Sequence, residues 1–447
     1  MADPDLLFSS ISQIGALYRS AQLSPVELTR LCLERVEALN PVLNAFITVT
    51  ADEALRQATQ AERELRSGHD RGPLHGVPIA LKDLIDTAGI RTTCASRILK
   101  DHVPQRDAAI VRRLKAAGAV SLGKTNCSEF AMGVAHPDYG QSNNPWDPAR
   151  TSGASSGGSA AAVAAGLCFA AVGTDTGGSI RIPASYCGLA GLKPTYGLVE
   201  LEGVFPLSWS LDHAGPLART SADAALLLEG MTGKSFGQHV DLRGVRFGVI
   251  QRGGLSVEPE VATVFESACE ALRAAGAEVQ EVDIEGLEQA DAALFSVLLP
   301  EAAAIHAQWI GHRAEDYAPM TRQQIEMGFS IPAVTHVRAQ QFRRWLTGQF
   351  LNALNSLDAL ISPTVAWVAP SEDPVFTGDA GAVEGNRTVP HNLTGLPALS
   401  VNAGFGEGGL PVGLQILTRP HSDALCLGIG VALEAVFRDC LYVGRGR

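Results

Sequence analysis

The sequence has no excess of basic residues and no long apolar run. Its 447 residues carry a formal net charge of −12, which gives a nucleic-acid partner little electrostatic support. The longest run of small apolar residues, 160–172, is shorter than the roughly 20 residues that span a bilayer. The chain opens Met-Ala-Asp-Pro-Asp, without the basic and apolar regions of a secretory signal. We therefore expect a cytoplasmic protein with no nucleic-acid or membrane partner.

Metal-binding and disulfide patterns are also missing. The eight cysteines form no Cys-x-x-Cys pair, and the eleven histidines show no His-Glu-x-x-His or other zinc spacing. Isolated cysteines in a chain of this length are typical of buried, reduced thiols in a cytoplasm. The sequence therefore implies no metal and no cofactor.

No linker, charge block or low-complexity stretch divides the chain, and its 46% hydrophobic content is ample for one large core. Short apolar runs predict buried strands, with helical patterns between many of them: 77–81, 119–122, 169–172, 246–250, 359–361 and 398–401. Strands that alternate with helices predict α/β layers around a mainly parallel or mixed sheet, in a single domain.

Two helices carry clear boundary signals. Ser24 and Glu27 predict a capped helix start, and Asn40-Pro41 predicts its end. A second helix is expected over 107–117, terminated by Gly118. Residues from about 255 to 345 are helix-rich without sharp motifs, and we expect substrate-selecting structure there.

Three familiar motif matches fail on context. Residues 118–125 satisfy the P-loop pattern, but a helix precedes them and the spacer is itself a predicted strand. Residues 153–157 satisfy the Gly-x-Ser-x-Gly nucleophile elbow, but turn residues rather than a strand come before them. The Ser-x-x-Lys match at 121–124 places its serine in the predicted strand, and no Lys-Thr-Gly follows.

Three segments carry residues suited to nucleophilic catalysis. Lys82 ends an apolar strand, where it is either a surface ion-pair partner or a group in a cleft. Residues 152–159 are rich in Ser and Gly and lead into an Ala-rich helix. In 170–184 a strand leads into a Gly-Gly-Ser turn ending at Ser179, which suits either a nucleophile beside an oxyanion hole or a capped turn.

Taken together, these segments resemble the amidase signature family, and the likeness covers most of the chain. The matching motifs are GVPIALKDLID at 76–86, GKTNCSEFAMG at 123–133, NPWDPARTSGASSGGSAAAVAAG at 144–166, GTDTGGSIRIPASYCGLAGLKPTYG at 173–197, LISPT at 360–364, NLTGLPALSVNAGF at 392–405 and LPVGLQIL at 410–417. Ala154, where many members have glycine, and Cys127 depart from the pattern. The resemblance implies one α/β/α domain over 1–447, with a central twisted mixed sheet covered by helices on both faces.

The resemblance also implies a Ser–Ser–Lys relay. Ser179 is the expected nucleophile, Ser155 the bridging serine after a cis 154–155 peptide bond, and Lys82 the base. Ser156 is expected to support Lys82 or its loop. The expected oxyanion hole consists of the backbone N–H groups of Thr176, Gly177, Gly178 and Ser179.

Further residues flank the expected site. Asp175 and Arg181 lie on either side of the nucleophile, and Arg181 suits either a substrate charge or a structural ion pair. Phe130, Ala131 and Met132 align with the family's pocket stretch, where core packing is the other interpretation.

These features predict a serine amidohydrolase that cleaves the C–N bond of a small-molecule amide or carbamate. Carboxylic amides, urethanes and anilides all present a carbonyl joined to nitrogen, so urethanase activity is included. The alternative is the glutaminase A subunit of a tRNA-dependent amidotransferase, which requires a partner subunit. A catalytically silent binding protein is a third class. The oligomeric state is open, and a homodimer is possible.

Overall fold

The computed structural model describes residues 4–250, 257–375 and 377–437, and within them one mixed sheet forms the centre of the fold. The sheet has eleven strands in the order β1-β3-β2-β4-β6-β5-β10-β11-β9-β7-β8. Their bounds are β1 Phe46–Val49, β2 Pro78–Lys82, β3 Val120–Thr125, β4 Ala170–Asp175, β5 Ala190–Lys193, β6 His213–Ala218, β7 Arg246–Ile250, β8 Glu278–Val282, β9 Ala359–Pro363, β10 Ala398–Phe405 and β11 Pro411–Leu417.

The parallel pairing of β2 and β4 brings the carboxyl ends of these two strands together at the same end of the sheet. Strand β2 pairs in parallel with both β3 and β4, whereas β4 pairs with β6 antiparallel. In the β2–β4 register, Leu81 is opposite Val172. The carboxyl ends of β2 and β4, which carry Lys82 and Asp175, therefore lie side by side.

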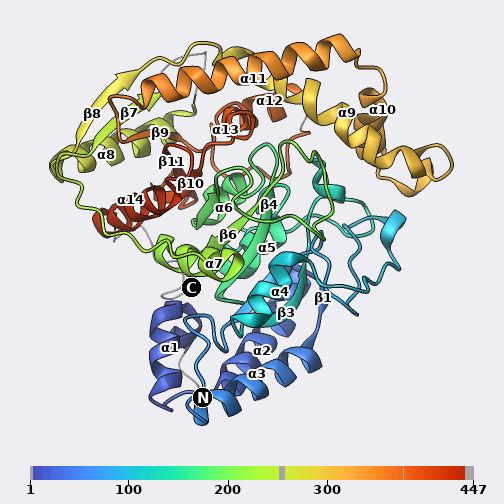
Figure 1. The fold of residues 1–447 in the computed structure, drawn as a ribbon, viewed down its shortest axis with the longest axis vertical. Helices are drawn as coiled ribbons and strands as arrows, with labels where there is room; N and C mark the ends of the chain where they lie inside the picture. Colours follow the sequence, from blue (N-terminus) through green and yellow to red (C-terminus); the bar gives the residue numbers. More distant parts are fainter. Residues whose placement is uncertain (1–3, 251–256, 376, 438–447) are drawn as a thin grey trace.

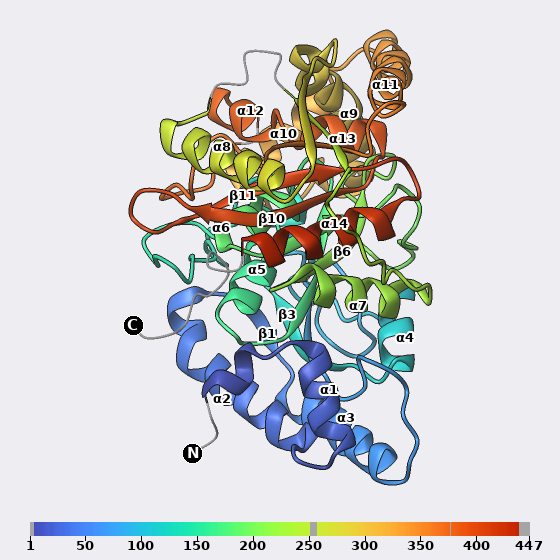
Figure 2. The same cartoon turned by 90° about the vertical axis from the view of Figure 1, so that its left-hand side faces the viewer.

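Helices flank the sheet on both sides (Figures 1 and 2). Their bounds are α1 Ile11–Arg19, α2 Pro25–Leu43, α3 Ala51–Arg66, α4 Ala109–Ala116, α5 Gly157–Ala164, α6 Arg181–Cys187, α7 Ser221–Thr232, α8 Pro259–Ala274, α9 Ala290–Ile310, α10 Pro319–Gly328, α11 Ala333–Ala353, α12 Asp379–Gly385, α13 Val389–Thr394 and α14 Asp423–Val436. Short 3-10 turns span η1 Pro4–Phe8, η2 Arg97–Leu99, η3 Glu129–Ala131, η4 Leu287–Gln289 and η5 Ala314–Asp316. Helices α1, α2 and α3 gather at one end, and α9 and α11 lie at the other (Figure 1).

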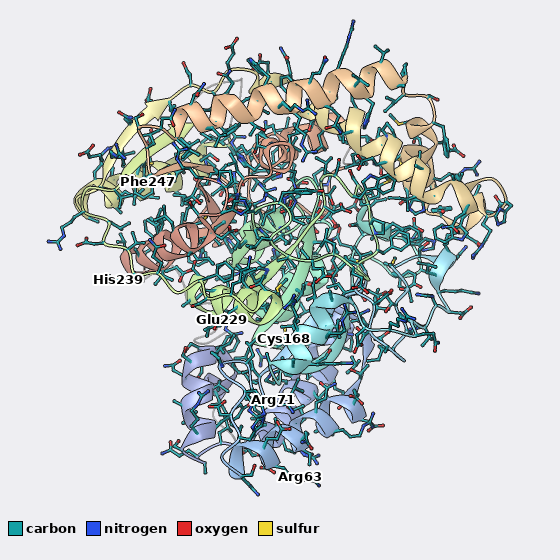
Figure 3. The ribbon with its side chains drawn as sticks, viewed as in Figure 1. Arg63, Arg71, Cys168, Glu229, His239 and Phe247 are labelled. Atoms are coloured by element: carbon teal, nitrogen blue, oxygen red, sulfur yellow. The ribbon has the colours of Figure 1, made fainter. Side chains whose placement is uncertain are left out.

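The central strands are buried at every position, which explains their continuous apolar runs. All residues of β2, β4, β6 and β11 are buried. A strand that is covered on both faces needs apolar residues at successive positions, not at alternate ones. Figure 3 shows the contrast between Cys168, which is buried directly before β4, and Arg63, which is exposed on α3 at the edge of the molecule.

The predicted α/β fold with a mixed sheet is confirmed, with local corrections. All six strands predicted from apolar runs are present. The helix predicted to end at Asn40-Pro41 instead continues to Leu43, because a proline in the last turn removes only one helical hydrogen bond. The second helix begins at Ala109 and not at 107, because Asp107 lies in the preceding loop, where its carboxylate accepts from the Ala88 N–H and from Lys115 of the helix.

The structure agrees with the reasons for rejecting the P-loop match at 118–125 and the nucleophile-elbow match at 153–157. Gly118 follows the end of α4, and the rest of the P-loop match forms strand β3. Lys124 is buried on that strand and donates to the Ile85 carbonyl, so it does not project into a phosphate-binding loop. Ser155 follows a loop, not a strand.

Among the described residues, one helical stretch, Leu287–Ile310, is long and apolar enough to cross a membrane by length and composition alone. More than half of its most apolar window is buried against the rest of the protein, as in a core helix. Seven cysteines are free and buried, and Cys440 lies outside the described residues.

Candidate active site

The side chain of Lys82 lies at the end of β2, fully buried, against three hydroxyl groups. Its Nζ donates to Ser155 Oγ at 2.7 Å, to Ser156 Oγ at 2.9 Å and to Thr174 Oγ1 at 2.9 Å. Burial lowers the pKa of Lys82 from its ordinary value of 10.5 to about 8, although Cys127 and Asp175 oppose the shift. At pH 7, about a tenth of this lysine is therefore neutral, far more than of a lysine with the ordinary pKa.

Two loops bring the serines to this lysine. The bond between Ala154 and Ser155 is cis, as the family resemblance implied. Ser156 accepts from the Thr174 N–H at 3.3 Å and donates to the Thr174 carbonyl at 3.1 Å, which fixes the serine loop against β4. The Ser156 N–H donates to the Ser179 carbonyl at 3.2 Å. The serine loop, residues 152–156, is therefore joined directly to the loop that carries Ser179, residues 176–180, which we call the nucleophile loop.

Ser179 is the accessible member of the group. Its neighbours from Thr174 to Ile180 are buried, whereas Ser179 itself is partly exposed. It lines a small cavity in which a substrate carbonyl could reach it. The other residues around this cavity are Ala131, Gly133, Ala154, Thr176, Gly177, Ile182, Leu207, Pro374 and Glu384.

The nucleophile loop is shaped by the carboxylate of Asp175. This side chain accepts from the Gly178 N–H at 2.9 Å and from the Ile180 N–H at 3.1 Å. Gly178 has a φ of 142°, and a Cβ there would lie 2.4 Å from Thr388 Oγ1, so only glycine fits. The Thr388 hydroxyl also donates to the Gly177 carbonyl at 2.6 Å.

These contacts correct one expectation about the oxyanion hole. The Gly178 N–H donates to Asp175, so it is not available for a developing oxyanion. Within the described chain, the N–H groups of Thr176, Gly177 and Ser179 have no such intramolecular acceptor. The predicted group of four amides is therefore reduced to three.

Arg181 belongs to a structural ion pair. Both Arg181 and Asp175 are fully buried, and they are joined by bonds of 3.0 and 2.9 Å. Burial alone would raise the pKa of Asp175, but the Arg181 charge and the hydrogen bonds hold it well below its usual range. Arg181 also donates to Gln415 Oε1 at 2.7 Å and to Asn392 Oδ1 at 2.6 Å, which leaves it no role in binding a substrate charge.

The three predicted pocket residues separate into two roles. Ala131 lines the cavity at Ser179. Phe130 and Met132 are buried in the core, and the Phe130 ring lies 4.5 Å from His306 and 5.0 Å from Phe205 between ring centroids. Core packing is therefore the observed role of these two side chains.

Sequence reasoning missed Thr174 and Asp212. Thr174 lies one residue before Asp175 on β4, and only the strand register could have placed it against Lys82. Asp212 accepts from Thr176 Oγ1 at 2.6 Å and from the N–H groups of Leu207 and Ser208, and so supports the nucleophile loop from behind. Burial raises the pKa of Asp212 to about 7.

A second small cavity lies on the other side of the bridging serine. Its lining includes Cys127, Ser155 and Asp373. A larger groove, with a volume of about 650 Å³, lies beside β1 and α3 and contains none of the predicted catalytic residues. Ser179 and Ser155 therefore line the small cavities and not this groove.

The large mixed sheet flanked by helices is also the fold of a solved amidase structure, which places the protein in the class of α/β amide hydrolases. Residues 27–427 match the family model described as Amidase. The chain belongs to this family, the amidase signature family.

The chain is similar over nearly its full length to individual proteins and solved structures of known description. The A subunit of the glutamyl-tRNA(Gln) amidotransferase of Thermosynechococcus vestitus is 38% identical, over 95% of this chain and 98% of its own. A solved structure described as an amidase has a TM-score of 0.88 at 36% identity, over 96% of this chain and 99% of its own. The native peptide amidase of Stenotrophomonas maltophilia has a TM-score of 0.82 at 32% identity, over 96% of this chain and 97% of its own.

The Arg181–Asp175 pair provides a test of this architecture. Replacement of Arg181 by Met leaves a buried carboxylate without its counter-charge, and we expect the free energy of unfolding to fall by about 3–5 kcal/mol. Chemical denaturation followed by circular dichroism measures the change. The matched control is Arg246→Met, which removes an exposed pair with Asp358 and should leave the free energy of unfolding nearly unchanged. Equal effects of the two substitutions would contradict the structural role of Arg181.

Proposed function

We propose that the chain is a serine amidohydrolase that cleaves an amide-type C–N bond through an acyl-enzyme on Ser179. The observation that carries the proposal is the fully buried Lys82, whose Nζ donates to Ser155 Oγ at 2.7 Å. A serine hydroxyl is a poor nucleophile until a base removes its proton. A lysine with a pKa of about 8 is a suitable base near neutral pH.

The proposed reaction uses Lys82 twice. As Ser179 attacks the substrate carbonyl, its proton passes through the Ser155 hydroxyl to neutral Lys82. The same relay then returns a proton to the departing nitrogen, which leaves as an amine and not as an amide anion. Ser156 and Thr174 hold the lysine in place, since each accepts a hydrogen bond from its Nζ. Water subsequently hydrolyses the acyl-enzyme.

The oxyanion that forms during attack needs hydrogen-bond donors fixed in advance. The N–H groups of Thr176, Gly177 and Ser179 are the proposed donors, since Asp175 and Thr388 hold the loop that carries them. Removal of one such donor from a hydrolase typically lowers kcat by about 10²–10³. The chemistry extends to carboxylic amides, urethanes and anilides, because each joins a carbonyl to nitrogen.

The role proposed for residues 255–345 is indirect. None of the described residues in this range lines either small cavity. Helix α9 instead supports the cavity walls, because His306 packs on Phe130 and Glu301 accepts from the Ser208 hydroxyl at 2.6 Å. Substrate selection by this segment stays a prediction.

The second candidate function is the glutaminase A subunit of an amidotransferase. The 38% identity to a relative of that name, over nearly the full length of both chains, favours this candidate over a free-standing amidase. The similarity to solved structures described as an amidase and a peptide amidase keeps the free-standing enzyme as a candidate, but it does not outweigh the amidotransferase relatives. Both candidates use the same acyl-enzyme and differ in substrate and partner.

Covalent labelling tests the nucleophile. A fluorophosphonate probe should label the wild-type protein, and Ser179→Ala should give no adduct by mass spectrometry. Lys82→Ala and Ser155→Ala should slow labelling by about 10²–10⁴, because each interrupts the removal of the proton. Ser67→Ala, which changes an exposed serine at the end of α3, is the control and should label like wild type. An adduct on Ser179→Ala would overturn the assignment.

The pH profile tests the base. Because the neutral form of Lys82 is the active one, kcat/KM should rise about tenfold per pH unit below pH 8 and level off above it. Thr174→Val removes an acceptor that stabilises the ammonium, so its midpoint should move to lower pH. Thr174→Ser keeps the hydroxyl and should retain the wild-type midpoint. A midpoint near the ordinary lysine value of about 10.4 would contradict a buried base.

A substrate screen distinguishes the two candidates. The purified chain is assayed for release of ammonia or amine from glutamine, primary aliphatic amides, carbamates and para-nitroanilides, with gel filtration in parallel. Turnover of neutral amides by the chain alone, at least about tenfold faster than glutamine, identifies a free-standing amidase. A glutamine preference together with a stable complex with an amidotransferase B subunit identifies the glutaminase component.

A further inference from the structure

Two buried or partly buried carboxyl groups flank the serines at the candidate site. Glu384 on α12 lines the cavity that contains Ser179. Asp373 lines the cavity that contains Ser155. Neither group has a role in the proton relay described above. Each of the two cavities therefore presents one carboxyl group to a ligand.

Glu384 is held at a fixed position relative to the nucleophile. Its Oε1 accepts from the Tyr186 hydroxyl, which in turn accepts from Trp367 Nε1 at 2.9 Å. Tyr186 lies on α6, the helix that begins two residues after Ser179. Beyond α12, Thr388 is bonded to the Gly177 carbonyl, so the chain on that side of Glu384 is also tied to the nucleophile loop.

Asp373 is held in the same way by the loop before the bridging serine. It accepts from Thr151 Oγ1 at 2.6 Å and from the backbone N–H of Ala154. Its charge also acts on Glu384, and Tyr186 is the other group that affects Glu384. The acidic groups therefore influence each other across the site.

No basic side chain lines either cavity among the described residues. Apart from the two acids, the cavity walls consist of small, apolar and hydroxyl or amide side chains. The nearest strong cation in the loop, Arg181, is fully occupied by Asp175, Asn392 and Gln415. Lys82 is in contact with Ser155 but lines neither cavity, and its Nζ donates to three hydroxyl groups. A ligand carboxylate in either cavity would thus meet an acidic side chain and no basic lining residue, whereas a ligand ammonium would meet a partner.

We propose that Glu384 determines specificity and that the preferred substrates are amides carrying a cationic amino group. This inference rests on the proposed function and names the substrate class of the same site. Burial raises the pKa of Glu384 to about 8 and that of Asp373 to about 6. In the empty site Glu384 therefore holds a proton near neutral pH. When a ligand ammonium binds, the carboxyl group releases this proton to solvent, and the ammonium lies beside the resulting carboxylate as its counter-charge.

Three amides of nearly equal size and different charge test the proposal. They are 4-aminobutanamide, pentanamide and glutaramate, which carry a cationic, a neutral and an anionic end on the same chain. Ammonia release by the wild-type protein should give a kcat/KM at least about tenfold higher for the cation than for the neutral amide, and lowest for the anion. This series needs no variant, so it does not depend on how a substitution folds.

A matched pair of variants assigns the preference to one residue. Glu384→Gln keeps an acceptor for Tyr186 but removes the charge, and the cation-to-neutral ratio of kcat/KM should fall to about one. Glu372→Gln changes an exposed glutamate in the same region and should retain the wild-type ratio. A wild-type protein without charge preference, or a Glu384→Gln protein that keeps it, would overturn the inference.

Binding separates failure of this inference from failure of the proposed function. Calorimetric titration of the Ser179→Ala protein with 4-aminobutanamide and pentanamide measures charge preference without turnover. Preferential binding of the cation with no hydrolysis by wild type would refute only the acyl-enzyme proposal. Hydrolysis of all three amides at similar rates, with equal binding, would refute only the role of Glu384.

Discussion

The complete burial of the Lys82 side chain is the constraint on which the rest of the site depends. Lys82 has no exposed surface, and its Nζ is surrounded by the hydroxyls of Ser155, Ser156 and Thr174. Hydroxyls satisfy the hydrogen bonds of an amine without supplying a full counter-charge, so the neutral form is accessible. A carboxylate in any of these positions would hold the lysine charged and remove its value as a base.

At the nucleophile loop, by contrast, the buried side chain of Asp175 must stay charged, because its carboxylate accepts the hydrogen bonds that shape the loop. Asp175 keeps its negative charge through Arg181 and uses it to orient the Gly178 and Ile180 amides. The same carboxylate therefore shapes the turn and occupies the Gly178 N–H, one of the four amides expected to form the oxyanion hole. Thus one buried charge is suppressed on β2 and another is preserved on β4, although these strands are direct neighbours.

Much of the fold and site was predictable from local patterns, and the limits are physical. Continuous apolar runs predicted the strands, and the resemblance to the amidase signature family implied that Lys82, Ser155 and Ser179 share one site. Contacts between distant segments were not predictable, such as Thr388 with Gly177 and Glu384 with Tyr186. These contacts join residues about 200 positions apart, and no periodicity or turn signal encodes them. The extension of α2 through Pro41 was missed because a proline in the last turn of a helix removes only one helical hydrogen bond and need not end the helix.

The partners of Arg181 have a consequence for how the protein is made. All three proposed catalytic residues occur in the first half of the sequence, yet the guanidinium beside them is held by Asn392 and Gln415. A nascent polypeptide on the ribosome therefore carries all three proposed catalytic residues before helix α13 and strand β11, which supply Asn392 and Gln415, are synthesised. Assembly of a working centre is delayed until synthesis is almost finished, which separates the appearance of the reactive serine from its activation in time.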